Sequence, residues 1–418
     1  MAGQTADCFA ALAMTGPSYR KVLRSIAEKY GTPCYVYSSP KLEAQCTALR
    51  HALPDAELRF AVKANSTAGI LRRIFQYGFG ADVVSGGELA RAMRAGATAD
   101  KIVFSGAGKT DSEIEEGVRL GVLFNAESPD ELSRIHAAAH RQASTARVLL
   151  RVNPNIDART NPYIATGLYA TKFGIAEDQL EQAAEQALSL PHLEWVGLGC
   201  HLGSQITDLS VFENGGRRMA ELAKTWKKRH PGLRILNLGG GLAVRYRDET
   251  PPKLADYART VAGAAQAAGL QLLLEPGRWV VAEAGALLTR VITVKTTPEK
   301  AFAVVDAAMN DLIRPSLYEA YHPVDAVDPR PGKNVLYDVV GPVCETGDFL
   351  ALDRSLPPLK AGDLLLVGVC GAYGATMASN YNSRPRAAEV WVDANGTPSL
   401  LRERETIDDL CSKDVGIS

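Results

Sequence analysis

The sequence predicts an α/β protein, a (β/α)₈ TIM barrel with a second, mostly β C-terminal domain. Between about residues 58 and 275, short and nearly all apolar runs alternate eight times with stretches of helical period. Such runs are typical of parallel strands that are buried on both faces. After about residue 285, strand patterns and turns predominate. A doubly wound sheet is the alternative for the first part, but eight alternations in about 220 residues fit a barrel better.

The elements follow from these patterns in chain order. The expected barrel strands are Leu58–Val62, Ala81–Val84, Ile102–Phe104, Val122–Phe124, Val148–Val152, Trp195–Cys200, Ile235–Leu238 and Leu272–Leu274. Helical patterns cover Ala68–Tyr77, Glu88–Ala95, Ser112–Arg119, Pro129–Arg141, Gln179–Leu188, Phe212–Arg229 and Leu254–Ala268. The later strands are Leu287–Val294, Phe302–Val305, Val335–Val340, Leu364–Val369 and Glu389–Val392. We therefore expect a barrel over residues 40–285 and a β domain over residues 286–418, with residues 1–39 adding a strand at Tyr35-Val36-Tyr37.

The composition excludes several classes of protein. Forty-six basic residues stand against 47 acidic ones, so no basic field is available to hold a nucleic acid. Seven cysteines without a C-x-x-C pair favour a reduced, cytoplasmic protein over a disulfide framework. The N-terminus has no basic flank followed by an apolar core, so no secretory signal is expected. Residues 364–383 are uncharged but contain several glycines and a polar run, so we read them as a buried strand entering a loop and expect no membrane span.

Polar residues gather where the expected barrel strands end. In a TIM barrel, these ends and the loops that follow them form the catalytic face. Taken in chain order they carry Lys63, Asp82, the run Arg151-Val152-Asn153-Pro154, the run from Cys200 to Gln205, the triplet Gly239-Gly240-Gly241, and Glu275-Pro276-Gly277-Arg278.

Two of these groups suit a phosphorylated aldehyde. Lys63 directly follows an apolar strand, where desolvation would lower its pKa and make its amine a nucleophile toward aldehydes. A lysine paired with a carboxylate at the rim is the alternative. The three glycines suit a phosphate, because backbone N–H groups approach oxygens closely only where no Cβ intrudes, and Ser204 adds a hydroxyl donor. A tight strand-to-helix turn is the alternative for the glycines.

The remaining groups suit an aromatic ring. The imidazole of His201 is able to lie flat against a ring; with Cys200 it resembles a metal-binding pair, but no third ligand follows at a familiar spacing, so we expect no metal. Glu275 and Arg278 are either a rim ion pair or the partners of a ring nitrogen and an anion. Lysine, phosphate loop, stackable histidine and carboxylate on one rim together describe a pyridoxal phosphate site.

Three other motifs are interpreted as structural. Residues 106–110, Gly-Ala-Gly-Lys-Thr, resemble the end of a P-loop, but Val103 stands where that motif needs glycine. His136 and His140 have metal-binding spacing on a helix but lack the glutamate of a metalloprotease motif. Lys227-Lys228-Arg229 ends a helix, where positive charge complements the helix dipole.

The chain resembles the diaminopimelate decarboxylase family, which belongs to the fold type III, alanine racemase-like pyridoxal phosphate enzymes. The resemblance runs from about Tyr30 to Asp393. It is carried by YGTPCYVY, FAVKAN, GADVVSGGEL, IVFSGAGKT, HLGSQI, LNLGGGL, EPGR, MNDLIRPSLYEAYH, GPVCETGDFL and GAYGATMASNYNSRPR. FAVKAN and EPGR indicate the wider class, whereas VCETGD and NDLIRPSLY are specific to the family. The family fold agrees with the barrel and β domain expected above.

The resemblance implies a role for each matching residue. It implies pyridoxal 5'-phosphate as cofactor, Lys63 as its Schiff-base lysine, and catalytic roles for Lys63, His201 and Cys344. Further cofactor contacts are implied for Asp82, His201, Ser204, Gly239, Gly240, Gly241, Glu275, Gly277, Arg278 and Tyr373. Substrate contacts are implied for Arg278, Arg314, Tyr318, Glu345 and Tyr373.

The activity implied is decarboxylation of meso-2,6-diaminopimelate to L-lysine and CO₂, the last step of lysine biosynthesis. Cys344 matches the proton donor and is supplied with Glu345 by the neighbouring subunit, so a homodimer is implied. Cys370 and Ala375 depart from the family pattern and bear on substrate breadth. The alternatives are a decarboxylase of another basic amino acid or carboxylated polyamine, and a catalytically inactive homologue that acts as a binding subunit.

Overall fold

The computed structural model describes residues 17–158, 167 and 171–416. The chain divides into two compact units: Cys46–Val244 with Thr250–Trp279, called the barrel unit here, and Met1–Gln45, Arg245–Glu249 and Val280–Ser418, called the β unit. The first 16 residues, including Cys8, lie outside the described residues. The expectations for the N-terminal segment are therefore compared with the structure from Pro17 onward. The chain passes between the units within α3 (Ser39–Ala52) and α11 (Arg278–Val281), and at both ends of the segment Arg245–Glu249.

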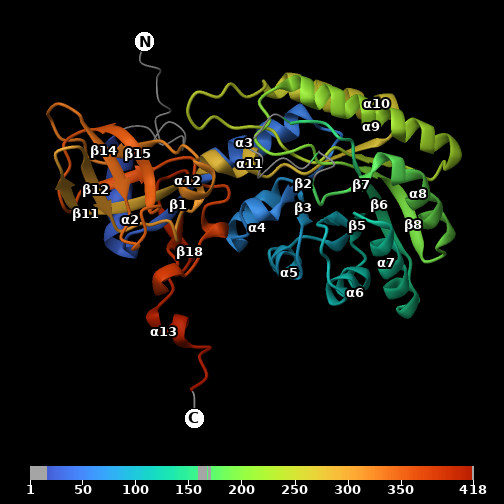
Figure 1. The fold of residues 1–418 in the computed structure, drawn as a ribbon, viewed down its shortest axis with the longest axis horizontal. Helices are drawn as coiled ribbons and strands as arrows, with labels where there is room; N and C mark the ends of the chain where they lie inside the picture. Colours follow the sequence, from blue (N-terminus) through green and yellow to red (C-terminus); the bar gives the residue numbers. More distant parts are fainter. Residues whose placement is uncertain (1–16, 159–166, 168–170, 417–418) are drawn as a thin grey trace. The chain divides into compact units, whose positions relative to one another are not determined.

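The barrel unit is built on eight parallel strands that close on themselves (Figure 1). Neighbours pair in the order β5-β4-β3-β2-β10-β9-β8-β6, and β5 pairs with β6 to complete the ring. The strands are β2 (Glu57–Ala61), β3 (Gly80–Val83), β4 (Ile102–Phe104), β5 (Leu123–Ala126), β6 (Ala146–Asn153), β8 (Leu193–Gly199), β9 (Ile235–Asn237) and β10 (Gln271–Leu274). A short strand, β7 (Ile175–Ala176), pairs with β6. The predicted TIM barrel is therefore confirmed.

Helices alternate with these strands and cover the outside of the barrel (Figure 1). They are α4 (Ala68–Gln76), α5 (Gly86–Arg94), α6 (Asp111–Leu120), α7 (Pro129–Arg141), α8 (Leu180–Ser189), α9 (Leu209–Arg229) and α10 (Leu254–Ala268), with single turns η1 (Val62–Ala64), η2 (Ala99–Lys101) and η4 (Glu177–Gln179). Their starts are set locally: Thr110 and Glu113 form a capping box on α6, and Ser128 accepts from the Glu131 N–H on α7.

The barrel interior is apolar, which explains why its strands lack an alternating pattern. Inward-facing side chains from five strands form one buried cluster, made of Val103, Leu123, Leu149, Val196 and Leu273. The outward-facing residues of the same strands are covered by the helices, so nearly every strand position is buried.

The β unit is a nine-stranded mixed sheet with few helices. Its strands are β1 (Cys34–Ser38), β11 (Gly285–Thr296), β12 (Ala301–Val305), β13 (Val324–Ala326), β14 (Val335–Val340), β15 (Phe349–Leu356), β16 (Leu364–Val367), β17 (Ala388–Val392) and β18 (Pro398–Arg402). Its helices and single turns are α2 (Pro17–Tyr30), α12 (Arg314–Tyr318), α13 (Ile407–Cys411), η5 (Ala282–Ala284), η6 (Ala375–Met377) and η7 (Tyr381–Ser383). Strand β1, which contains Tyr35-Val36-Tyr37, pairs antiparallel with β11 and parallel with β17.

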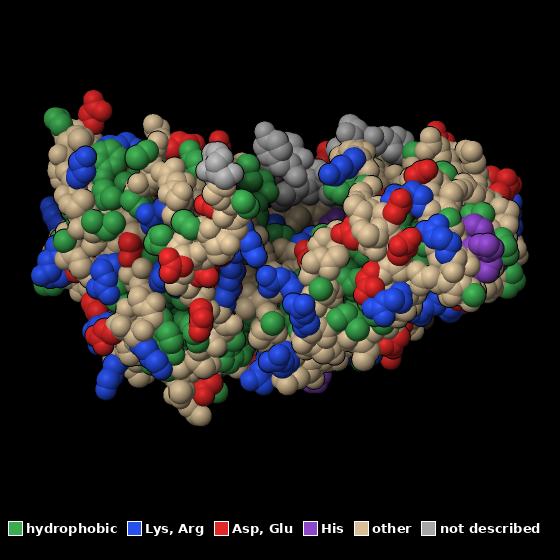
Figure 2. Space-filling model, turned by 90° about the horizontal axis from the view of Figure 1, so that it is seen from below, with side chains coloured by type: hydrophobic (Ala, Val, Ile, Leu, Met, Phe, Trp, Pro, Cys, Tyr) green, Lys and Arg blue, Asp and Glu red, His purple; other side chains and the backbone are tan. Residues whose placement is uncertain are grey.

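Three features bear on the class of protein. Leu364–Val367 of the uncharged stretch form the buried strand β16, and no helix in the described part of the chain has the length and apolar character to cross a membrane. The six described cysteines are all free thiols. Figure 2 shows acidic and basic side chains interspersed over the face that it presents, as the net charge of −1 leads one to expect.

Candidate active site

The barrel unit brings one group of predicted residues to the carboxyl ends of its strands. Lys63 lies in η1, directly after β2, and its Nζ is 3.0 Å from Oδ2 of Asp82 at the end of β3. Asp82 is fully buried, and its other oxygen, Oδ1, has no hydrogen-bond partner among the described residues. Lys63 is thus paired with a carboxylate, which was the alternative interpretation of this lysine from the sequence. The buried Oδ1 of Asp82 still lacks a hydrogen-bond donor among the described residues.

Glu275 lies at the end of β10 and carries the most perturbed carboxyl of this group. It is buried, and its Oε1 accepts a hydrogen bond of 2.6 Å from Nδ2 of Asn237. Burial, and after it the negative charge of Asp82, raises the pKa of Glu275 to about 7, although Lys63 acts in the opposite direction. A cationic hydrogen-bond donor beside this carboxylate would relieve the cost of burying its charge.

His201 follows β8 and presents a neutral ring. The backbone N–H of Gly240 donates to its Nδ1 at 3.1 Å, which leaves the proton of the neutral imidazole on Nε2. Burial, together with the positive charges of Lys63 and Arg151, lowers the pKa of His201 well below its usual value. A neutral imidazole is suited to stack against an aromatic ring.

The glycine triplet after β9 lies where a side chain has no room. A Cβ would come within 2.6 Å of the Cys200 oxygen at Gly239, 2.3 Å of the Glu275 oxygen at Gly240, and 2.5 Å of the Gly203 oxygen at Gly241. Backbone oxygens therefore leave no room for any side chain at these three positions. The tight turn, which was the alternative interpretation of the glycines from the sequence, is present. The turn also leaves the Gly241 N–H without an acceptor among the described residues.

Ser204 and Arg278 complete this end of the barrel. The Nη2 of Arg278 donates to Oγ of Ser204 at 3.0 Å, and Arg278 is buried. A Cβ added at Gly277 would lie only 3.0 Å from the Cβ of Ala61.

These residues fit pyridoxal phosphate. The unsatisfied N–H of Gly241 with Ser204 and Arg278 is a donor set for a phosphate, and the buried Glu275 carboxyl suits a pyridine nitrogen. Lys63 is an amine at the same ends of the strands. No group of histidine, cysteine or acidic residues able to hold a metal ion occurs in the part of the chain that the structure describes.

The β unit holds the other predicted residues. Arg314 is buried at the start of α12, its Nε donates to Nε2 of His322 at 3.2 Å, and its guanidinium lies 5.1 Å from the ring centre of Tyr246. Tyr318 ends the same short helix. Tyr373 has a φ of +57°, a left-handed conformation that is rare for a tyrosine.

Cys344 and Glu345 lie together on an exposed turn of the β unit. The Cys344 thiol is exposed, its backbone N–H donates to Oδ1 of Asn382 at 3.4 Å, and Tyr381 donates to Oε2 of Glu345 at 2.8 Å. Asp348 holds this turn by accepting the Val343 N–H at 2.6 Å. A thiol and a carboxylate are thus displayed on the surface of one chain.

Cys370, one of the two departures from the family pattern, is not a reactive thiol. It is buried and its Sγ donates to the Val367 oxygen at 3.2 Å. Burial raises the pKa of Cys370 to about 12, so the thiol stays protonated. Ala375, the other departure, begins η6 and is half-buried.

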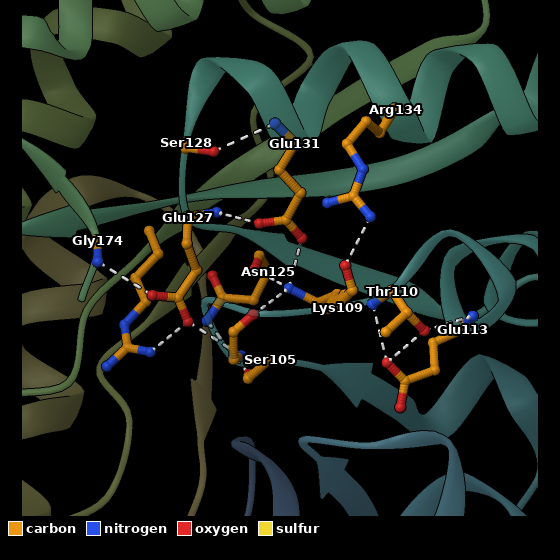
Figure 3. Close-up of polar contacts among 12 residues, drawn as sticks. Ser105, Lys109, Thr110, Glu113, Asn125, Glu127, Ser128, Glu131, Arg134 and Gly174 are labelled. Carbon is orange, nitrogen blue, oxygen red and sulfur yellow. Dashed lines mark hydrogen bonds and ion pairs between the residues drawn. The ribbon is translucent and has the colours of Figure 1, made fainter. Parts of the chain in front are cut away.

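The structure adds residues that the sequence did not assign. Asn237 orients Glu275, and Arg151 donates to Glu127 at 2.6 Å from within the barrel wall. Figure 3 shows the polar network around Glu127, in which Lys109 of the P-loop-like motif reaches Glu131 and the backbone of Asn125. Arg151 and Asn237 stand at strand ends, so position gave a signal, but their partners come from other strands.

Comparison with known proteins gives a consistent result. The pyridoxal binding domain of the pyridoxal-dependent decarboxylases matches residues 39–282. A diaminopimelate decarboxylase of Pseudomonas aeruginosa is 50% identical over 391 residues, 93% of this chain and 94% of its own. One from Neisseria meningitidis is 47% identical over 393 residues, 93% of this chain and 96% of its own. The crystal structure of diaminopimelate decarboxylase from Helicobacter pylori, complexed with L-lysine, superposes with a TM-score of 0.90 at 39% identity and covers 93% of this chain and 98% of that chain.

Proposed function

This chain belongs to the diaminopimelate decarboxylase family of pyridoxal-dependent enzymes, and from that premise we propose which of its residues carry the reaction. The reaction is the decarboxylation of meso-2,6-diaminopimelate to L-lysine and CO₂. When bound, pyridoxal phosphate supplies an electron sink for the electron pair that the departing CO₂ leaves behind. The observation that carries the assignment is the meeting of Lys63, Asp82, His201 and Glu275 at one end of the barrel.

Lys63 holds the cofactor covalently through Nζ, with Asp82 beside it at 3.0 Å. Glu275 would accept a hydrogen bond from the pyridine nitrogen and hold the proton there, which would make the cofactor a stronger electron acceptor. The support for this role is that a buried carboxylate with a raised pKa gains most from a cationic donor. His201, which is neutral and oriented by Gly240, would stack on the cofactor ring.

The phosphate is held by the turn after β9. Gly241 would offer its backbone N–H group, while Gly239 and Gly240, whose N–H groups donate to Asn237 and His201, shape the turn around the phosphate. Ser204 and Arg278 would offer a hydroxyl and a guanidinium that already contact each other. Gly277 and Tyr373 complete the proposed set of cofactor contacts. These donors would fix the orientation of the cofactor through its phosphate and leave its reactive carbon accessible to the substrate.

Substrate selection depends on charge at the far end of the substrate. Diaminopimelate differs from L-lysine by a distal carboxylate, which the planar guanidinium of Arg314 is able to grip with two donors, while Glu345 pairs with the distal ammonium. Arg278, Tyr318 and Tyr373 complete the proposed substrate contacts. A substrate without the distal carboxylate would leave the buried Arg314 unpaired, at a cost of about 1–3 kcal/mol.

Cys344 protonates the carbon that has lost CO₂, delivering the proton from Sγ. Cys344 and Glu345 are exposed in the single chain, and we assign them to the active site of the neighbouring subunit in a homodimer. A thiol that works as an acid has to stay reduced, so the proposal places the reaction in the cytoplasm.

A mixing experiment tests the shared site. Lys63→Ala and Cys344→Ala subunits are each expected to be nearly inactive alone. Refolded or exchanged together, they form hybrid dimers in which one of the two sites has both residues intact, so about a quarter of the wild-type activity returns. If mixing restores nothing although hybrids form, the assignment of Cys344 to the partner's site is wrong.

A substrate panel tests selection. Turnover of diaminopimelate, L-lysine, L-ornithine and L-arginine is compared for the wild-type enzyme and for Arg314→Gln. The wild type is expected to act on diaminopimelate alone, and Arg314→Gln to lose most of its kcat/KM for it. Equal turnover of L-lysine by the wild type would contradict the proposal.

A further inference from the structure

The barrel has a polar cavity at the amino ends of its strands, the end opposite to the candidate active site. Its volume is about 610 Å³. It is lined by residues that precede or begin β2, β4, β5, β6, β9 and β10, so it belongs to the barrel unit alone. Its charged lining residues are five cations and two carboxylates, namely Arg50, Arg59, Lys101, Arg147, Arg234, Glu57 and Asp100.

Arg59 is the most buried of these cations, with 8% of its side chain exposed. Its Nη2 contacts Glu57 and the backbone oxygen of Asp100, the latter at 3.4 Å. Its Nε is buried and has no hydrogen-bond partner in the described part of the chain. Burial lowers the pKa of Arg59, the carboxylates of Glu57 and Asp100 act in the opposite direction, and the positive charges of Arg147 and Arg50 add to the lowering. Arg59 thus has a carboxylate partner in Glu57 but keeps a buried donor without an acceptor, in a lining where five cations face two carboxylates.

The contacts that the other arginines make with the protein neutralise only part of the positive charge of the cavity. Arg50 donates to the backbone oxygens of Ala56 and Gly78 at 2.9 and 3.1 Å, and Arg147 donates to that of Gly121 at 3.0 Å. These bonds satisfy carbonyl groups in the loops that lead into the barrel strands, but carbonyl groups carry no net charge. Arg234 alone reaches a carboxylate outside the lining, Glu194, at 2.8 Å.

Lys101 shows the imbalance at the mouth of the cavity. Its side chain is exposed and makes no ion pair with any residue that the structure describes. Its neighbour Asp100 offers Arg59 a backbone oxygen as hydrogen-bond acceptor, and the charges of Arg59 and Lys101 both help to lower the pKa of the Asp100 carboxyl. The cavity therefore keeps a net positive charge after every carboxylate that reaches its lining is counted.

We infer that this cavity binds a small multivalent oxyanion, a phosphate ester or a polycarboxylate, at the end of the barrel away from the reaction. Guanidinium and ammonium groups that converge on a concave site are the usual recognition elements for such anions. The volume exceeds that of a single phosphate and suits an organic anion. The ligand supplies negative charge to the lining and ties the loops before β2, β4 and β6 together.

Calorimetric titration of the pyridoxal phosphate-loaded enzyme tests this inference. Saturating L-lysine keeps the active site filled, the ionic strength is held constant with KCl, and pyrophosphate and citrate are the probes. One additional site per chain is expected. The double variant Lys101→Gln/Arg147→Gln is expected to weaken binding by about tenfold or more, because two charge-assisted contacts are removed. The control Arg217→Gln/Lys224→Gln makes the same change in net charge on exposed positions of α9.

The binding constants of the wild type, the cavity variant and the control variant decide between support and refutation. Binding that weakens in the cavity variant and persists in the control supports the site, and the tighter of the two probes distinguishes a phosphate from a carboxylate ligand. No saturable binding of either probe, or equal binding to the cavity variant and the wild type, would overturn the inference. If the double variant fails to fold, Lys101→Glu at the exposed position reverses a charge without removing an ion pair and decides the question in the same way.

Discussion

Replacing Lys109 by methionine is expected to destabilise the barrel unit strongly. The Lys109 side chain is fully buried between β4 and α7, and Figure 3 shows its ammonium at the centre of a polar network. Its Nζ donates to Oε1 of Glu131 at 2.5 Å, to the oxygen of Gly106 at 2.9 Å and to that of Asn125 at 3.1 Å. Methionine has a similar length and fits the space, but it has no hydrogen to donate.

The magnitude follows from what is left behind. Glu131 is also buried, and its other oxygen accepts the Glu127 N–H at 2.9 Å, so Lys109→Met leaves an unpaired carboxylate away from water. Breaking a buried ion pair by removing one partner costs about 3–5 kcal/mol. In Lys109→Met/Glu131→Gln the charge is gone and the amide oxygen still accepts the Glu127 N–H. This double variant is therefore expected to be about 1–3 kcal/mol more stable than Lys109→Met.

Equilibrium unfolding in urea measures both values. Far-UV circular dichroism follows the protein at fixed concentration with saturating cofactor, and the midpoints are compared at a common slope. Arg119→Met is the matched control, because it breaks an ion pair with Glu116 that is exposed on α6, and its midpoint is expected to stay nearly unchanged. If Lys109→Met shifts the midpoint no more than Arg119→Met, or if the double variant is no more stable than the single one, the reasoning is refuted.

Three further outcomes are expected. Lys63→Ala removes the absorbance of covalently held cofactor at the edge of the visible range, and a surviving band would mean that another lysine is the anchor. Cys344→Ala lowers kcat while the cofactor stays bound, so an unchanged kcat would show that the proton comes from another group. In the cofactor-free protein, the pKa of Glu275 is raised from its usual 4.5 to about 7, so the folded state holds an extra proton between these values. The free energy of unfolding therefore falls as the pH rises from about 4.5 to 7, and Glu275→Gln flattens that fall; identical pH profiles of the two proteins would contradict the burial argument.

Much of the candidate site was predictable because strand ends are local features. Lys63, Asp82 and Glu275 each follow a short apolar run, and a parallel barrel carries the ends of all its strands to one rim. The hydrophobic pattern that defines the strands thus also places the polar residues that follow them. The glycine triplet was predictable for the same reason, although its main local cause, crowding by backbone oxygens, was visible only in the folded chain.

The partners of these residues were not predictable. Asn237 and Glu275 are 38 residues apart, and Glu127 and Arg151 are 24 apart, yet each pair makes a hydrogen bond of 2.6 Å. Such pairs form because β9 lies beside β10 and β5 beside β6 in the closed sheet. No periodicity along the chain encodes which polar side chain meets which across two strands.

The sequence by itself determined the class of fold and the chemical character of the site. Apolar runs have to be buried, helical periods have to cover them, and glycine, lysine and glutamate keep their chemistry wherever they lie. Only the tertiary structure decided the ionisation of Glu275, the tautomer of His201 and the excess charge around Arg59. These properties depend on burial and on charges brought close from distant parts of the chain, and both arise only when the barrel closes.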